Sequence, residues 1–219
     1  MSNQADFKVF REINRAEFVK AIEKHNQKVL YMAPWTPNQI YTKKPIKSVD
    51  DLKGIKMRSV DRNTTELARR MGMVPVQGDR RRHPCARVGR AGGAHDLARH
   101  RGRPEGREFA KYGYLTNHIW ASNAMVVNKD AWGKLKPEHQ AAIEKAARDM
   151  EPGFWEIAAG DDAIRMKQMR DAGMILKEPP ADVSSAMQAA AKPMWEEFAN
   201  TVGGPVPANL KAYLARTGK

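Results

Sequence analysis

The chain has 219 residues, of which 42% are hydrophobic and 29% are charged, and its formal net charge is +13. This composition excludes a disordered polar chain, and the length suffices for one domain or for two small lobes with a buried core. The single cysteine excludes a disulfide within the chain, and no apolar stretch is long enough to span a membrane. The first residues lack the basic start and apolar centre of a secretory signal, so we expect none in this chain.

The N-terminal third alternates between helical and extended patterns. Phe7 and Phe10 belong to an apolar series at helical spacing, and Ser48 and Asn63 each occupy the position of a helix N-cap. Gly54 supplies a stop signal for the helix that Ser48 begins. The expected elements are a helix over 6–28, strands over 29–32 and 39–42, a short helix over 49–52, a strand over 55–59, a helix over 64–71 and a strand over 74–76. This order favours an α/β fold with a parallel sheet.

The segment Gly78–Arg107 interrupts that order. It holds nine arginines, no lysine, three of the six histidines and the only cysteine, and its net charge is +6. Arginines of this density suggest contacts to nucleic-acid phosphates. The segment has no Phe, Tyr or Trp on which a base could stack, and no known nucleic-acid-binding motif flanks it. Nucleic-acid binding therefore stands as an alternative to a disordered or misread insert.

The same segment contains four potential metal ligands, His83, Cys85, His95 and His100. The last two have the spacing of the histidine half of a zinc finger, but the first two lack the cysteine spacing of the other half. Chance clustering in a biased segment is the simpler interpretation. The glycines of Gly89–Gly93 are not followed by Lys and Ser or Thr, so no phosphate-binding loop is expected. We predict neither a metal nor a cofactor.

Regular patterns return after the segment. Leu115–Asn128 is apolar enough for one strand or a pair of strands, and Pro137 begins a helical pattern. Pro152 either kinks this helix or begins a new one, which ends at Gly173. The remaining expected elements are a strand over 174–176, a helix that includes 187–198 and a final helix over 208–215.

Catalytic patterns are absent from the sequence. There is no Gly-x-Ser-x-Gly nucleophile motif, and the lone cysteine lies in the anomalous segment. His118 could act as a base, but in an apolar strand a hydrogen-bonded structural histidine is the simpler interpretation. Trp120, Trp155 and Trp195 are expected to anchor the core. We therefore expect no enzyme.

One basic residue, Arg58, fits a ligand site. The alternation over 55–59 places Lys56 and Arg58 on one face of a strand, with Ile55 and Met57 on the other. A guanidinium offers a planar fork for a carboxylate, and the carboxyl ends of strands in α/β sheets face the ligand crevice. On spacing alone, a surface arginine paired with a neighbouring acid is the simpler interpretation.

The run Lys43–Ser59, KKPIKSVDDLKGIKMRS, resembles the substrate-binding proteins of tripartite ATP-independent periplasmic (TRAP) transporters, the C4-dicarboxylate-binding family. Their pattern is Pro-Ile-Lys-Ser, Asp-Leu-Lys-Gly, then a strand that ends in Met-Arg or Leu-Arg. The resemblance continues in LARRMGMVPV (67–76), EFAKYGYLTN (108–117) and VVNKDAWGKL (126–135). It thus extends from about residue 28 to the end, apart from the arginine-rich segment.

The resemblance implies a two-lobed α/β periplasmic solute-binding protein with mixed and parallel sheets and a largely missing first lobe. Such proteins close on a small carboxylate and deliver it to membrane permease subunits, so no nucleic-acid partner is expected. The ligand carboxylate would bind Arg58. A second contact would come from Asn38, where relatives often have arginine and this chain has an uncharged amide. The first-lobe remnant would comprise 1–36 and 124–162, and the second lobe 37–123 and 163–219.

Two departures from the family are expected. Its members carry a signal peptide and a longer N-terminal part, so this chain would lack most of the first lobe. After Val76 they have a helix and a cleft-lining strand where this chain has Gly78–Arg107. A frameshift in GC-rich DNA explains the second departure, because codons chosen for Gly78–Cys85 and for His95–Gly106 give family-like sequence at one common offset. A genuine divergent insert and a non-functional gene product are the alternatives, and sequencing the gene decides about the frameshift.

Overall fold

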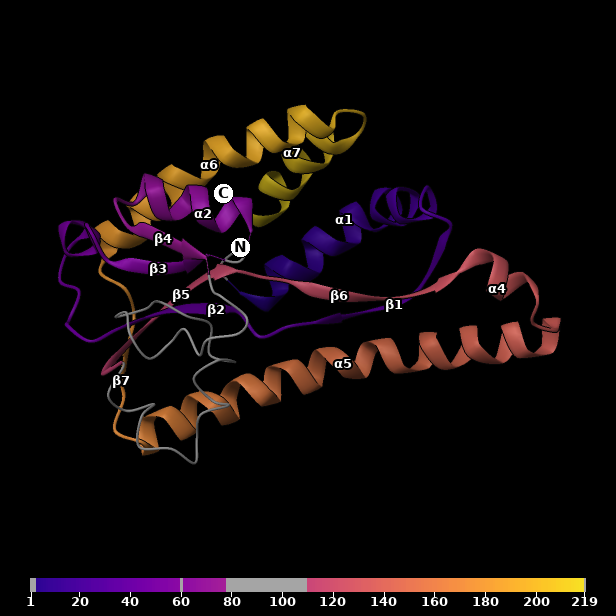
Figure 1. Ribbon diagram of the computed structural model, residues 1–219, viewed down its shortest axis with the longest axis horizontal. Coiled ribbons are helices and arrows are strands. Elements are labelled where there is room, and N and C mark those ends of the chain that lie inside the picture. Colours follow the sequence, from indigo (N-terminus) through magenta and orange to yellow (C-terminus); the bar gives the residue numbers. More distant parts are fainter. Residues whose placement is uncertain (1–2, 60, 78–109, 219) are drawn as a thin grey trace.

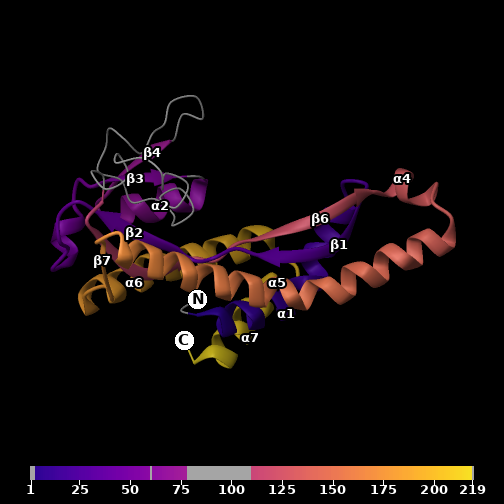
Figure 2. The ribbon, with the colours of Figure 1, turned by 90° about the horizontal axis from the view of Figure 1, so that it is seen from below.

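The computed structural model describes residues 3–59, 61–77 and 110–218. Its strands form a middle layer in Figure 1, with the long helix α5 (Pro137–Asp171) on one side. Helices α1 (Gln4–Glu23), α6 (Ala181–Val202) and α7 (Val206–Thr217) lie on the other side. Figure 2, from below, shows α5 in front of the strands. The predicted α/β class is confirmed.

Two consecutive strands at the start of the chain pair with two consecutive strands after residue 110. Strand β1 (Gln27–Pro34) is antiparallel to β6 (Ser122–Asn128), and β2 (Asn38–Thr42) is antiparallel to β5 (Tyr112–Ile119). The β1–β2 and β5–β6 connections also bind each other, because the Trp35 N–H donates to the Ala121 carbonyl at 2.8 Å. The apolar stretch 115–128 therefore contributes to two strands.

Parallel pairing occurs elsewhere in the fold. Strand β7 (Ile175–Lys177) is parallel to β5, and β3 (Lys56–Ser59) is parallel to β4 (Val74–Gln77) with α2 (Arg62–Arg70) between them. The expectation of a parallel sheet is therefore right for these pairs and wrong for β1–β6 and β2–β5, so the sheets are mixed. Periodicity shows which residues face inward, but it does not show strand direction across such long separations.

The caps of the short helices follow local side-chain chemistry. Ser48 is the predicted N-cap of the 3₁₀ helix η1 (Val49–Leu52), and Gly54 follows that helix with φ of 74°. The Asp51 carboxylate accepts from the Ser48 N–H at 3.1 Å, which completes the cap. For α2 the predicted cap, Asn63, is wrong. Asp61 Oδ1 accepts from the Thr64 N–H at 2.7 Å, and Thr64 Oγ1 accepts from the Asp61 N–H at 3.1 Å. This reciprocal pair begins the helix two residues earlier.

Helix α5 runs for 35 residues without a break, although Pro152 lies inside it. Of the two options for Pro152, a new helix is therefore excluded. Pro152 and Arg148 are both exposed, so water can satisfy the Arg148 carbonyl that a proline leaves without an N–H partner. The helix ends before Gly173, whose φ is 84°. The short helix α4 (Lys129–Gly133) precedes α5 and is capped by the Asn128 side chain.

The main core joins β2, β3 and β5 to α2 and α6. Its most deeply buried members include Ile40, Leu52 and Val183, each no more than 1% exposed. Tyr114 also belongs to it, and its hydroxyl accepts from the Ile46 N–H at 2.6 Å. A smaller cluster around the fully buried Tyr41 ties the β2–β5–β7 sheet to α5. Strands β2, β3 and β5 thus share one core. This core fixes the positions of their ends, where the candidate ligand-binding residues lie.

Candidate ligand-binding site

Arg58 lies near the carboxyl end of β3, where the sequence predicted it. Met57 and Ser59 are buried, Lys56 is exposed and Arg58 is half-buried, so the expected alternation is present. The Nε atom of Arg58 is enclosed by protein. Packing therefore positions the guanidinium at the end of its strand, where its charge can be presented in a fixed direction.

Asn38 begins β2 and lies opposite Ile119 at the end of β5. The register shifts between Asn38 and Ile40. Next to the shift, Gln39 Nε2 donates to Asn117 Oδ1 at 2.7 Å, and the Asn117 N–H donates to Gln39 Oε1 at 3.0 Å. This amide pair fixes the backbone beside Asn38. The pair could not be predicted from the sequence, because the two residues are far apart in the chain.

His118 lies beside Asn38 and acts as a structural residue. Its Nδ1 is 2.7 Å from Thr116 Oγ1, and its ring also has a hydrogen bond to the Asn38 backbone. Burial lowers the pKa of His118 to about 4, and this exceeds the opposing effect of the Asn38 hydrogen bond. The ring is therefore neutral at pH 7, and it adds no positive charge to the region.

The strand ends that carry Arg58 and Asn38 lie on one side of the shared core. Figure 1 shows β3 and β5 both running towards the middle of the molecule, where the chain continues into β6. Because β2 is antiparallel to β5, the start of β2 lies at that same end. Asn38 thus lies where the chain crosses to β1 and β6, and β3, which carries Arg58, ends on the same side of the core in Figure 1.

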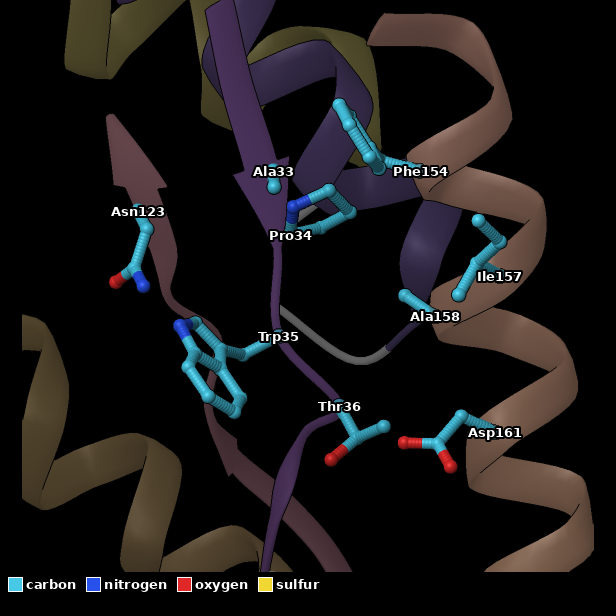
Figure 3. A pocket seen from close by; sticks show the side chains of 9 residues that line it. All are labelled: Ala33, Pro34, Trp35, Thr36, Asn123, Phe154, Ile157, Ala158 and Asp161. Carbon is cyan, nitrogen blue, oxygen red and sulfur yellow. The ribbon is translucent and has the colours of Figure 1, made fainter. Parts of the chain in front are cut away.

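A pocket of about 230 Å³, which was not predicted from the sequence, lies between the β1–β2 connection and α5. Figure 3 shows Trp35 and Thr36 on one wall and Phe154, Ile157 and Asp161 on the other. Arg58 and Asn38 are not among its lining residues. The pocket is therefore separate from the predicted carboxylate site. Its acidic residue, Asp161, forms an ion pair of 2.7 Å with Arg165.

A second pocket, of about 300 Å³, lies between α1 and α5. Glu151 binds two arginines there, Arg15 at 2.7 Å and the largely buried Arg11 at 2.9 Å. The Arg11 guanidinium also lies 4.9 Å from the centre of the Trp155 ring. Burial would raise the pKa of the Glu151 carboxyl, but hydrogen bonds from Arg15 and Arg11 outweigh burial and hold that pKa below its usual range. The cluster joins two helices.

Replacing Glu151 by glutamine is expected to lower the free energy of unfolding by about 1–2 kcal/mol at pH 7, because charge-assisted hydrogen bonds are lost. A carboxyl whose pKa is lowered by folding stabilises the fold above its ordinary pKa of 4.5. That contribution is lost as the pH falls further. Urea titrations from pH 7 to pH 3 should therefore show the variant and its parent converging. Glu12→Gln, at an exposed pair with Arg216, serves as the control and should change stability less.

Several expected features cannot be compared with the structure. His83, Cys85, His95, His100 and the glycines of Gly89–Gly93 lie outside the described residues, as does the whole proposed nucleic-acid-binding segment. Over 3–59, 61–77 and 110–218, no three His, Cys, Asp or Glu side chains are grouped as metal ligands. Within the same ranges, no helix is both long and apolar enough to cross a membrane. Of the predicted core anchors, Trp155 is buried, and Trp120 and Trp195 are half-buried.

Two bacterial solute-binding proteins are similar to this chain in sequence. The C4-dicarboxylate-binding periplasmic protein DctP of Rhodobacter capsulatus is 25% identical over 174 residues, which are 78% of this chain and 52% of that protein. A solute-binding protein of Chromohalobacter salexigens is 33% identical over 94 residues, 42% of this chain and 26% of its own length. The chain thus spans about half the length of the first relative.

Solved structures share the fold. An extracytoplasmic solute receptor of Bordetella pertussis that binds pyroglutamic acid matches with a TM-score of 0.84 and 22% identity, over 97% of this chain and 71% of its own. The ectoine-binding protein of the TeaABC TRAP transporter of Halomonas elongata gives 0.80 and 18%, over 98% and 72%. Both likenesses confirm the α/β fold with mixed and parallel sheets that the family resemblance implied.

The family described as "Bacterial extracellular solute-binding protein, family 7" matches residues 2–78 and 105–201. The match begins earlier than the resemblance in the sequence indicated, since it includes α1, and it ends within α6. The unmatched stretch 79–104 lies inside Gly78–Arg107. Both a frameshift and a divergent insert predict such a gap, so the choice between them stays open. With most of its length matched, the chain belongs to family 7 of the bacterial extracellular solute-binding proteins.

Proposed function

We propose that this chain is the solute-binding component of a TRAP-type transporter, which binds a small organic acid in the periplasm for membrane permease subunits. Membership of the family carries this proposal. The relatives support it, because one is named for binding C4-dicarboxylates in the periplasm and another for binding pyroglutamic acid. Arg58 is the proposed ligand for the carboxylate, and Asn38 the second contact.

The position of Arg58 supports its role. A half-buried guanidinium at a strand end is less screened by water than one on an open surface, so its attraction to a carboxylate is stronger. Lys56, on the same strand face, is exposed, and its charge is weakened by solvent. Carboxylate binding would therefore depend on Arg58 much more than on Lys56.

Two adjacent uncharged side chains, Asn38 and His118, favour a ligand with one carboxylate. Asn38 is an amide, and the adjacent His118 is uncharged at neutral pH because burial lowers its pKa to about 4. One arginine and one amide suit a carboxylate that carries a neighbouring hydroxyl, amide or keto group. A second carboxylate would lack an ionic partner at Asn38, so monocarboxylates should bind better than dicarboxylates.

The proposed mechanism is binding with closure of two lobes and no chemical step. The first lobe would comprise 1–36 and 124–162, and the second 37–123 and 163–219. The separate β1–β6 and β2–β5–β7 sheets support this division. Helix α7 also reaches α1, since the Phe10 and Tyr213 rings meet edge to face at 5.7 Å. The last helix of the proposed second lobe therefore contacts the first.

A thermal-shift panel tests the proposal. Pyroglutamate, lactate and succinate would each be compared with the corresponding neutral amide. A carboxylate present at about 100 times its dissociation constant should stabilise the fold by about 2.7 kcal/mol. This should raise the melting temperature by roughly 5–10 °C for a chain of this size. The amides should have little effect. A cooperative melt that no carboxylate shifts would contradict the function.

A further inference from the structure

Four large apolar side chains form an exposed line along α5. They recur every seven residues and are Ile143 (37% exposed), Met150 (47%), Ile157 (65%) and Ile164 (56%). A seven-residue repeat keeps side chains in one slowly drifting stripe of an α-helix, which is the pattern of a helix that packs against another helix. Single exposed apolar residues are ordinary, whereas a continuous stripe marks an interaction surface.

A small residue lies three positions after each of the first three of these apolar side chains. They are Ala146, Gly153 and Gly160, and a Cβ atom added at either glycine would meet no atom within 4 Å. Glycine weakens a helix interior, yet α5 has two on this line. Each leaves a hollow beside a large side chain, so the stripe presents knobs and holes to a second helix.

The rest of the described fold leaves this stripe uncovered. The buried positions Trp155, Met166 and Met169 of α5 lie on its other face. Figure 1 shows α5 along the lower edge of the molecule, and Figure 2 shows it in front of the strands. Ile157 also borders the pocket that contains Trp35 (Figure 3). At 1.5 Å per residue the stripe is about 32 Å long.

We propose that the stripe is a contact surface between two copies of this chain, with their α5 helices antiparallel about a twofold axis. In the best register, residues face each other when their numbers add to 317. Ile157 then enters the hollow at Gly160 of the second copy, and Ile164 enters the hollow at Gly153. Met150 packs along the alkyl chain of Lys167. Twofold symmetry makes each of these contacts occur twice.

Charge complementarity selects a second copy and this register. At the edge of the stripe, Asp149 lies beside Arg170 of the other copy. Both residues are exposed, and Asp149, which pairs with Lys145 within α5, would gain Arg170 as a partner. A slide of one heptad in one direction places Glu156 opposite its own symmetry mate, which is repulsive. A slide in the other direction keeps only one pairing of an isoleucine with a glycine, Ile164 with Gly160. The stripe is thus complementary to itself in one arrangement.

Sedimentation velocity of the purified chain at increasing concentration tests this proposal. The parent should show a reversible monomer–dimer equilibrium. Gly160→Leu fills the hollow and should abolish the dimer, whereas Ala159→Leu, on the exposed side of the same turn, should leave it unchanged. A parent that stays monomeric, or a dimer that Gly160→Leu leaves intact, would overturn the proposal.

A charge exchange provides a second test that adds no bulk. Asp149→Arg and Arg170→Asp should each weaken dimerisation about tenfold, because each replaces two attractive pairs by two repulsive ones. The double variant restores opposite charges and should return the dissociation constant to within about threefold of the parent. A double variant as weak as the single ones would contradict this register. The test is independent of carboxylate binding.

Discussion

Arg58→Ala should weaken binding of the best carboxylate from the thermal-shift panel by roughly 30- to 1,000-fold, because loss of one partner from a hydrogen-bonded charge pair costs about 2–4 kcal/mol. Isothermal titration calorimetry with the purified chain measures the change. Without ligand, the melting temperature of this variant should stay close to that of the parent. Arg58 is only half-buried, and its strand neighbours Met57 and Ser59 provide most of the packing.

Arg58→Lys separates charge from geometry. Lysine keeps the positive charge but loses the planar fork that binds both carboxylate oxygens, so its affinity should lie between those of the parent and the alanine variant. An Arg58→Lys variant with the full parental affinity would show that only net charge matters at this position.

Lys56→Ala is the matched control for Arg58→Ala. Lys56 lies on the same strand, on the same side and two residues earlier, but it is exposed. Its removal changes the net charge equally and should alter affinity no more than about threefold, because exposed charges are screened. If both alanine variants lost affinity to the same extent, the effect would be general electrostatic attraction, and Arg58 would not be the specific ligand.

Local chemistry explains which elements could be predicted from the sequence. The cap at Ser48, the turn at Gly54 and the alternation through Arg58 depend on residues within a few positions of each other, and the structure has all three. The cap of α2 was misplaced because Asp61 and Asn63 are both good caps. Only the contact between Asp61 and Thr64 distinguishes them.

Features that depend on distant pairing could not be predicted. The antiparallel pairing of β1 with β6 joins residues that are far apart in the chain, and periodicity carries no information on strand direction. The Trp35 pocket needs β1, β6 and α5 together. For the site, alternation placed Arg58 on its strand face, but the role of Asn38 came only from the family resemblance. The amide pair that fixes its neighbour, Gln39 with Asn117, left no signal in the sequence.

Gly113→Ala should destabilise the fold by about 1–3 kcal/mol, the usual cost of overfilling a packed core. Gly113 lies in β5, opposite Tyr41 of β2 and Leu176 of β7. A Cβ atom there would lie 2.6 Å from Leu176 Cδ2 and 3.0 Å from Tyr41 Cε1. The Tyr41 ring is fully buried, so it has little room to move away. The clash should outweigh the small entropic gain of replacing glycine.

Thermal and urea unfolding would measure this cost, with Gly133→Ala as the control. A Cβ atom at Gly133 meets nothing within 4 Å, so that variant should differ from the parent by less than about 0.5 kcal/mol. Leu176→Val removes the Cδ2 atom that causes the closest contact. In that background Gly113→Ala should cost less, and the difference is the coupling energy of the two sites. An equal cost in both backgrounds would show that the contact with Leu176 is not the cause, and would leave the Tyr41 ring as the obstacle.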